Sequence, residues 1–162
     1  MNDAFHLTVD TFAPDQTAEL AIRLGAALGP GDTVLLDGPV GAGKSHFSRA
    51  LIQSRLAALG RMEDVPSPSF TLVQTYDLEA VEIWHADLYR LSDPQEIVEL
   101  GLEEAFSTAI CLVEWAGHLG DMAPAAALHV SILPGAAPEA RQISFSGPAS
   151  WQDRLSAVLA AV

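Results

Sequence analysis

Hydrophobic residues recur along this chain with two different periods, one typical of strands and the other typical of helices. Short alternating or continuous apolar runs predict strands over residues 5–10, 33–37, 69–76, 80–86, 109–113, 127–133 and 141–145. Apolar side chains at helical spacing predict helices over residues 14–28, 47–59 and 148–161, and a further helix that opens at Asp93-Pro94. The first strand alternates as an edge strand does. The run at 109–113 is apolar throughout, which is typical of a strand covered on both faces.

A glycine-rich octet joins the strand predicted at 33–37 to the helix that follows it. Residues 38–45 read Gly-Pro-Val-Gly-Ala-Gly-Lys-Ser and fit the pattern G-x-x-x-x-G-K-[ST] of a phosphate-binding P-loop. Its glycines allow the tight turn that points successive N–H groups at phosphate oxygens. Lys44 is the only lysine of the chain and would bring a positive charge to the β- and γ-phosphates. The Ser45 hydroxyl is a Mg²⁺ ligand in such loops, so the octet predicts nucleotide binding.

The order of the predicted elements indicates the fold class. Helices and strands alternate in the first half of the chain, and hairpins appear later. We therefore expect an α/β protein: a three-layer, P-loop NTPase-like domain with a mixed, mainly parallel sheet flanked by helices. A length of 162 residues, with no internal repeat or long linker, predicts a single P-loop nucleotide-binding domain over residues 1–162.

Two acidic residues, Asp87 and Glu114, come directly after predicted strands. Open α/β sheets bind ligands at the carboxyl ends of their strands, so both residues are candidates to hold Mg²⁺ or to orient an attacking water. His85 and Asp87 form an H-x-D pair, but two ligands without a third are a weak metal signal. We interpret His85 as a packing or hydrogen-bonding residue, and Trp115 as a core or cleft-wall aromatic residue.

The charge balance of the chain is strongly acidic. Eight basic residues stand against 21 acidic ones, which gives a net charge of −13 at pH 7. The arginines are scattered from Arg23 to Arg154 and form no cluster in the sequence. Nucleic-acid affinity depends on clustered lysines and arginines, so we expect no direct nucleic-acid binding.

The sequence shows neither an export signal nor a membrane span. Its start, Met1-Asn-Asp-Ala, is not basic and leads into no long apolar run, and no stretch approaches about 18 apolar residues. The single cysteine, Cys111, can form neither an internal disulfide nor a zinc cluster. We therefore expect a cytoplasmic protein without membrane contact.

Four blocks of residues resemble, in the same order, the TsaE (YjeE) family, the P-loop ATPases of bacterial tRNA threonylcarbamoyladenosine synthesis. The resemblance covers roughly residues 7–146. The blocks are 37–45 with the P-loop, 67–76 (Ser-Pro-Ser-Phe-Thr-Leu-Val-Gln-Thr-Tyr), 85–90 (His-Ala-Asp-Leu-Tyr-Arg), and 99–104 together with 113–115 (Val-Glu-Trp). A P-loop alone indicates a superfamily, whereas the four blocks together are specific to this family.

The resemblance implies roles for the matching residues. Lys44 would bind phosphate and act in catalysis with Asp87, and Ser45 with Glu114 would hold Mg²⁺. The implied ATP-binding residues are Gly38, Val40, Gly41, Ala42, Gly43, Lys44 and Ser45, and position in the family adds Thr17 and Arg141. The implied switch-like residues are Ser67, Ser69 and Thr71. His85 and Trp115 lie in the matching blocks.

The function that the resemblance implies is that of an ATP-binding and ATP-hydrolysing subunit with Mg²⁺ as cofactor. It would be required for threonylcarbamoyladenosine modification of tRNA and would act with the TsaB and TsaD subunits, which would stimulate a low intrinsic ATPase activity. Two departures from the family stand out. Ser69 replaces the usual threonine of the switch motif and keeps a hydroxyl. The usual Glu-Trp-Pro-Glu is Glu114-Trp-Ala-Gly117 here, so any role of the second acid is absent.

Two other functions fit a P-loop domain. A small-molecule kinase generally neutralises the transferred phosphoryl group with several lid arginines, but residues 91–140 contain no arginine. A nucleotide-gated assembly factor, in which hydrolysis only times complex formation, is a further alternative that overlaps with the family function. A regulatory GTPase is excluded, because its Asn-Lys-x-Asp motif needs a second lysine.

Overall fold

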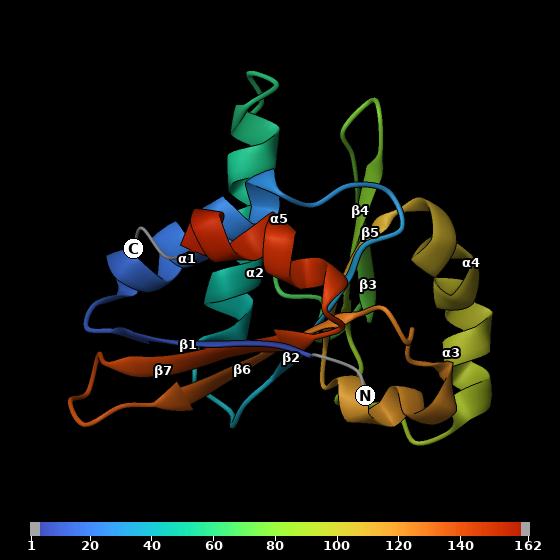
Figure 1. Cartoon of the computed structure of the whole chain (residues 1–162). Coiled ribbons are helices and arrows are strands. Elements are labelled where there is room, and N and C mark those ends of the chain that lie inside the picture. The colour runs from blue at the N-terminus through green and yellow to red at the C-terminus, as the bar shows by residue number, and fades with distance from the viewer. Residues whose placement is uncertain (1–3, 160–162) are drawn as a thin grey trace.

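The computed structural model describes residues 4–159 and contains a seven-stranded sheet (Figure 1). The strands are β1 (Phe5–Thr11), β2 (Thr33–Asp37), β3 (Val73–Asp77), β4 (Glu82–Asp87), β5 (Ile110–Glu114), β6 (Leu128–Pro134) and β7 (Arg141–Gly147). The helices are α1 (Pro14–Ala26), α2 (Lys44–Ala57), α3 (Pro94–Leu100), α4 (Leu102–Thr108) and α5 (Ser150–Leu159), with a 3₁₀ segment, η1, over Ala116–Met122.

The strand order is β1-β7-β6-β2-β5-β4-β3, with β2 at the centre. β2 is parallel to both of its neighbours, β5 and β6, and β4 is parallel to β5. β3 and β7 are antiparallel to the strands beside them. Because β1 is antiparallel to β7, it runs in the same direction as β6, and five of the seven strands share one direction. The predicted mixed, mainly parallel sheet is therefore confirmed.

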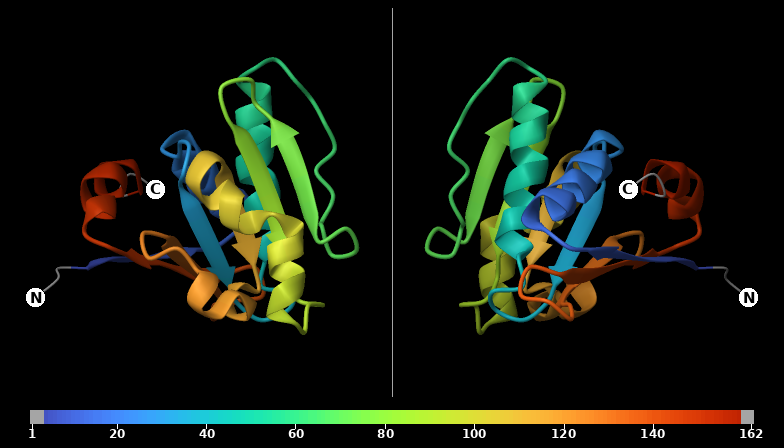
Figure 2. Two further views of the ribbon diagram at one scale, coloured as in Figure 1. Left: turned by 90° about the vertical axis from the view of Figure 1, so that its right-hand side faces the viewer. Right: turned by 90° about the vertical axis from the view of Figure 1, so that its left-hand side faces the viewer.

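Helices cover both faces of the sheet, which confirms the predicted three-layer arrangement. α1, α2 and α5 lie on one face, and their buried side chains form a common core with one face of the central strands (Figure 2). α3, α4 and η1 lie on the other face over a second core that includes Leu35 and Val113. Because β2 and β5 contribute to both cores, they are buried on both sides. No helix within residues 4–159 has the length and apolarity needed to cross a bilayer.

The hairpin and the helix after it differ in detail from the sequence prediction. β3 begins at Val73 instead of residue 69, because Ser69 to Leu72 form a turn in which the Leu72 amide donates to the Pro68 carbonyl over 2.7 Å. Leu72 has a φ of 70°, a left-handed conformation that no regular strand contains. The helix predicted from residue 93 is divided at Gly101, whose φ of 81° ends α3 and begins α4. Asp93 caps α3 through a bond from the Gln95 amide.

Cys111 is the second residue of β5 and is fully buried. Burial away from water disfavours the thiolate and raises the pKa of the Cys111 thiol to about 12. The side chain therefore remains a thiol at neutral pH, and it packs between α4 and the sheet with Ala105 and Ala109.

Candidate functional site

The register of three parallel strands brings the candidate residues to one edge of the sheet. Leu36 on β2 is paired with Glu114 on β5, and Glu114 is paired with Asp87 on β4. All three strands run in the same direction, so their carboxyl ends meet where the P-loop leaves β2. The two acids predicted from strand ends therefore lie side by side next to the phosphate-binding loop.

The P-loop, residues 38–43, turns tightly between β2 and α2. Gly38, Gly41 and Gly43 have φ values of 151°, 82° and 111°, conformations that side-chain-bearing residues rarely adopt. A Cβ atom on Gly38 would lie 2.3 Å from the backbone oxygen of Ile132, so this position also requires the absence of a side chain. Gly43 is the N-cap of α2 and directs the positive end of the helix at the loop. This geometry fits an anion such as the phosphates of a nucleotide.

Lys44, the first residue of α2, lies almost fully buried within the loop, with 5% of its surface exposed. Its ammonium donates to the carbonyl oxygens of Gly38, at 2.6 Å, and Pro39, at 3.1 Å. It also lies 4.3 Å from the ring centroid of Trp115, which is a cation–π contact. Burial lowers the pKa of Lys44, and the negative charges of Glu114, Asp87 and Asp37 oppose that effect.

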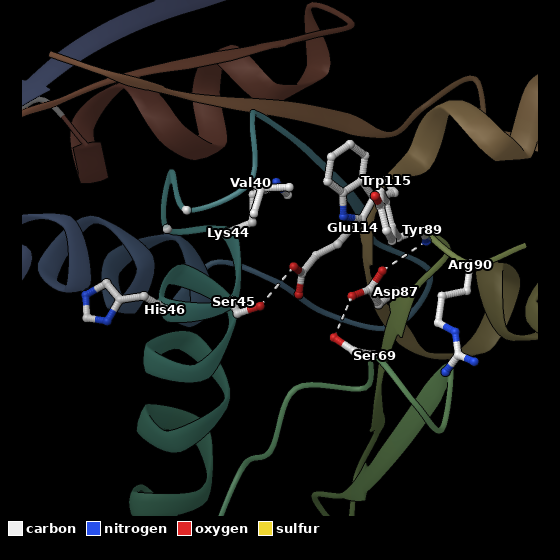
Figure 3. Close-up of a pocket in the computed structure, with 12 residues that line it drawn as sticks. Val40, Lys44, Ser45, His46, Ser69, Asp87, Tyr89, Arg90, Glu114 and Trp115 are labelled. Atoms are coloured by element: carbon white, nitrogen blue, oxygen red, sulfur yellow. Dashed lines mark hydrogen bonds between the residues drawn. The ribbon is translucent and has the colours of Figure 1, made fainter.

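Ser45, in the first turn of α2, faces Glu114 at the end of β5. The Ser45 hydroxyl donates to Glu114 Oε1 over 3.1 Å, as Figure 3 shows. A hydroxyl and a carboxylate beside a phosphate-binding loop are the hard oxygen ligands that Mg²⁺ takes, usually with only one or two carboxylates. Within residues 4–159 there is no group of three or more His, Cys, Asp and Glu side chains that could hold a metal by itself. The residues present therefore fit Mg²⁺ bound together with nucleotide phosphates.

Glu114 has a second partner on β4. Its Oε2 atom lies 2.6 Å from Nε2 of His85, and both side chains are almost fully buried. His85 therefore pairs with Glu114, not with Asp87 as an H-x-D metal pair would. This hydrogen bond corresponds to the interpretation of His85 as a packing or hydrogen-bonding residue, not to its interpretation as a metal ligand.

Asp87 connects the cleft with the segment expected to be switch-like, residues 67–71. Ser69 donates its hydroxyl to Asp87 Oδ2 over 3.2 Å, and the hydroxyl oxygens of Ser67 and Ser69 are 2.9 Å apart. The Asp87 amide donates to the carbonyl of Leu72. Thr71 lies apart from this chain of contacts, is exposed, and accepts a hydrogen bond from Gln74.

A cleft of about 470 Å³ opens between the P-loop and the carboxyl ends of β4 and β5 (Figure 3). Trp115 forms one wall, with its ring centroid 4.8 Å from that of Tyr89. Trp115 has φ 58° and ψ 45°, a strained conformation for a large side chain and one that occurs often at functional sites. The residues lining the cleft are Val40, Gly41, Gly43, Lys44, Ser45, His46, Ser69, Asp87, Tyr89, Arg90, Glu114 and Trp115.

Thr17 and Arg141 lie at a neighbouring pocket of about 210 Å³ that shares Gly43 and His46 with the main cleft. Arg141 donates its Nε–H to the carbonyl of Ala42 over 2.7 Å, so it contacts the P-loop backbone directly. Thr17 is buried, and its hydroxyl lies 2.7 Å from that of Thr11. Both residues are thus brought beside the loop by elements far from it in the sequence.

His46, Tyr89 and Arg90 also line the cleft. Sequence reasoning assigned no role to His46 or Tyr89, and it considered Arg90 only as a candidate arginine finger. His46 directly follows the P-loop serine, and Tyr89 and Arg90 follow Asp87 by two and three residues. Closeness to a motif was the available signal. It was not decisive, because side chains next to a motif residue commonly point away from the site.

Comparison with known proteins gives one consistent result. Residues 11–143 match the model of a protein family described as "Threonylcarbamoyl adenosine biosynthesis protein TsaE". A protein of Rickettsia bellii named tRNA threonylcarbamoyladenosine biosynthesis protein TsaE is 39% identical over 73% of this chain and 80% of its own length. The protein of the same name from Bacillus subtilis is 34% identical over 84% of this chain and 82% of its own length.

The coverage of these relatives varies. The Rickettsia felis protein of the same name is 45% identical, but the matched region spans only 57% of its length and 62% of this chain. Among solved structures, the fold is similar to a crystal structure of Bacillus subtilis YdiB, with a TM-score of 0.77 and 28% sequence identity. That similarity covers 99% of this chain and 98% of the YdiB chain.

The first prediction concerns the close approach at Gly38. Gly38→Ala should lower the free energy of unfolding by more than Gly41→Ala does. Each substitution places a side chain at a positive φ, at a cost of about 1–2 kcal/mol. Only the new Cβ atom at position 38 would also overlap a backbone oxygen, because nothing lies within 4 Å of a Cβ built on Gly41. Urea unfolding without nucleotide measures both variants, and equal losses would contradict the prediction.

Proposed function

Because the chain belongs to the TsaE family, we propose that it is an ATP-binding and ATP-hydrolysing subunit required for threonylcarbamoyladenosine modification of tRNA. The observation that carries this proposal is the hydrogen bond from Ser45 to Glu114 over 3.1 Å. It lies beside the P-loop, in which a Cβ atom on Gly38 would overlap a backbone oxygen. In the proposed function the chain acts in the cytoplasm together with the TsaB and TsaD subunits.

The residues of the P-loop would bind and orient the triphosphate. The backbone N–H groups and the N-terminus of α2 would contact the phosphate oxygens, and Lys44 would move from its loop carbonyls to the β- and γ-phosphates. Ser45 and Glu114 would hold Mg²⁺, which neutralises charge on the phosphates when bound. Thr17 and Arg141, at the adjoining pocket, are proposed to contact the remainder of the nucleotide.

Asp87 is the proposed group for the attacking water. It lies next to Glu114 in the strand register and does not contact Ser45; its oxygens accept hydrogen bonds from the Ser69 hydroxyl and the Tyr89 amide. Hydrolysis is favoured over a kinase reaction, because the lining of the cleft contains a single arginine, Arg90, whereas kinases generally neutralise the transferred phosphoryl group with several. Trp115 would exclude water from one side of the cleft.

The rim of the cleft supports action with partner proteins. Val40 and Tyr89 line the cleft and are 79% and 59% exposed, and Phe70, which is 86% exposed, lies beside Arg90 of the lining. The guanidinium of Arg90 lies 5.4 Å from the Phe70 ring. Exposed apolar side chains gathered at one opening are typical of a protein–protein contact. A partner there would cover the nucleotide and stimulate a slow intrinsic hydrolysis.

Direct tRNA binding is not part of the proposed function. The net charge of −13 would repel a polyanion within a Debye length of about 8 Å at physiological salt. The one lysine lies inside the P-loop and is assigned to the nucleotide. Contact with tRNA would therefore come through the partner subunits.

The second prediction tests nucleotide binding itself. Lys44→Ala should abolish tight binding of ATP with Mg²⁺, because the loop would lose its only ammonium. Arg23→Ala is the matched control: it also removes one positive charge, but from an exposed pair with Glu19 on α1. Isothermal titration calorimetry measures both variants. Wild-type affinity in Lys44→Ala would refute the proposed site.

The third prediction separates the two acids of the cleft. Glu114→Ala should mainly weaken Mg²⁺-dependent nucleotide affinity, because Glu114 faces Ser45. Asp87→Ala should mainly lower turnover by about 10²-fold, because it removes the group proposed to orient water. Glu104→Ala, at an exposed position of α4, should change neither quantity. Wild-type hydrolysis in both cleft variants would show that these roles are wrong.

The fourth prediction concerns stimulation by partners. Addition of a cognate TsaB–TsaD pair should raise the steady-state ATPase rate of the chain, and Phe70→Ser should reduce that stimulation because it removes the most exposed apolar side chain of the rim. Val98→Ser is the control, since Val98 is exposed on α3 away from the cleft. An unchanged rate on adding the pair would contradict the proposed partnership.

A further inference from the structure

Both carboxylate oxygens of Glu114 have a partner in the structure. Oε1 accepts from the Ser45 hydroxyl at 3.1 Å, and Oε2 lies 2.6 Å from Nε2 of His85. We assign the hydrogen of this contact to Nε2 of His85, because a carboxylate in its ionised form only accepts hydrogen bonds. His85 and Ser45 therefore hold the carboxylate from opposite sides, and its position along the cleft is fixed by two hydrogen bonds.

His85 reaches Glu114 from behind the site. It lies on β4 beside Leu112 of β5, in the core beneath α2, with 1% of its surface exposed. Glu114 is among the described residues that line the cleft, and His85 is not among them. The imidazole thus contacts the acid that faces the ligand without contacting the space that the ligand would occupy.

The rest of the imidazole makes no competing polar contact. Nδ1 of His85 is buried and has no hydrogen-bond partner within residues 4–159. Buried polar atoms are nearly always paired, so an unpaired nitrogen reduces the stability that the ring contributes. A histidine selected for packing alone would be replaced at no loss by an apolar residue. Among the described residues, Glu114 is the one hydrogen-bond partner of the His85 ring, and this bond distinguishes His85 from such a residue.

Without His85, the Glu114 carboxylate would be attracted strongly to the ammonium of Lys44. The negative charge of Glu114 acts on the ammonium of Lys44, which is buried in the same cleft. Yet the ion pairs within residues 4–159 do not include Lys44 with Glu114. In the structure the carboxylate is bonded to His85 on β4 and to Ser45, whereas the Lys44 ammonium is bonded to carbonyl oxygens of the P-loop.

We propose that His85 is a positioning residue that holds the Glu114 carboxylate toward Ser45 and thereby sets the affinity for Mg²⁺ in the nucleotide complex. This inference rests on the proposed function, because it concerns the same site. Outer hydrogen-bond partners of metal-binding residues typically change metal affinity by about 10- to 100-fold when they are removed. His85 would therefore determine Mg²⁺ binding without touching Mg²⁺ or ATP.

The test compares two amide substitutions at position 85. The amide of His85→Gln can donate from near the position of Nε2, whereas the amide of His85→Asn is too short and lies near Nδ1. Calorimetry with ATP, in EDTA and in MgCl₂, gives the gain in affinity that Mg²⁺ produces. We expect His85→Asn to reduce this gain by about 10- to 100-fold and His85→Gln to keep most of it. Affinity in EDTA should be the same in all three proteins, since the P-loop is unchanged.

A double-mutant cycle establishes whether His85 acts through Glu114. In the Glu114→Ala background, His85→Asn should cause no further loss of the Mg²⁺-dependent gain, because the carboxylate that it positions is already absent. Additive losses would overturn the proposal, and so would a wild-type gain in His85→Asn or an equal loss in His85→Gln. Should His85→Asn fail to fold, the Gln variant carries the test, and a lost Mg²⁺ gain there overturns the proposal.

The outcomes also separate this inference from the function on which it rests. A wild-type chain whose ATP affinity does not depend on Mg²⁺ would refute the proposed Mg²⁺ site as well. A wild-type chain with a clear dependence that is unchanged in His85→Asn would overturn only the role of His85. A merely structural role would lower the melting temperature and the metal-free affinity of His85→Asn together, and that result also overturns the proposal.

Discussion

The site depends on the register of three parallel strands, β2, β5 and β4. Leu36, Glu114 and Asp87 form one row across these strands, so the P-loop and both acids lie at the same edge. Side chains alternate between the faces of a strand, and a slip of β5 by one residue would turn Glu114 to the opposite face. Because β2 and β5 are buried by helices on both sides, such a slip would also expose apolar residues of each core. The packing of the whole domain therefore determines the position of the acids.

The register also concentrates charge where water is excluded. Lys44, Asp87, Glu114 and His85 are all buried, with at most 6% of their surfaces exposed. Burial of a charged group is costly unless it is paired and hydrogen-bonded, and here each charge has defined partners in the loop, the helix or the next strand. Burial lowers the pKa of Lys44 even though three carboxylates act in the opposite direction. The site therefore holds its charges close together before any ligand contributes, which is the condition for electrostatic preorganisation.

The sequence predicted those parts of the site that depend on local patterns. The P-loop was identified from eight consecutive residues, and Glu114 and Asp87 from their places after apolar strands, because strand ends in such sheets lie at the ligand edge. The contact between His85 and Glu114 joins residues 29 positions apart and depends on strand order, which the pattern does not determine. The same limit applies to Arg141, which reaches the Ala42 carbonyl across 99 positions. The late start of β3 was missed because the left-handed turn at Leu72 has no glycine to indicate it.

The hydrogen bonds of Asp87 connect the nucleotide cleft with the segment that carries Phe70, where the proposed partner would bind. The Ser69 hydroxyl and the Leu72 carbonyl hold residues 67–72 to Asp87, and Phe70 extends from the same segment into solvent. A group that binds Asp87 competes with Ser69 for the same carboxylate, so it changes how firmly the segment is held. A partner that binds Phe70 would act on the same segment. Coupling between two binding sites is reciprocal. If partner proteins strengthen nucleotide binding through this segment, nucleotide must therefore strengthen partner binding by the same factor.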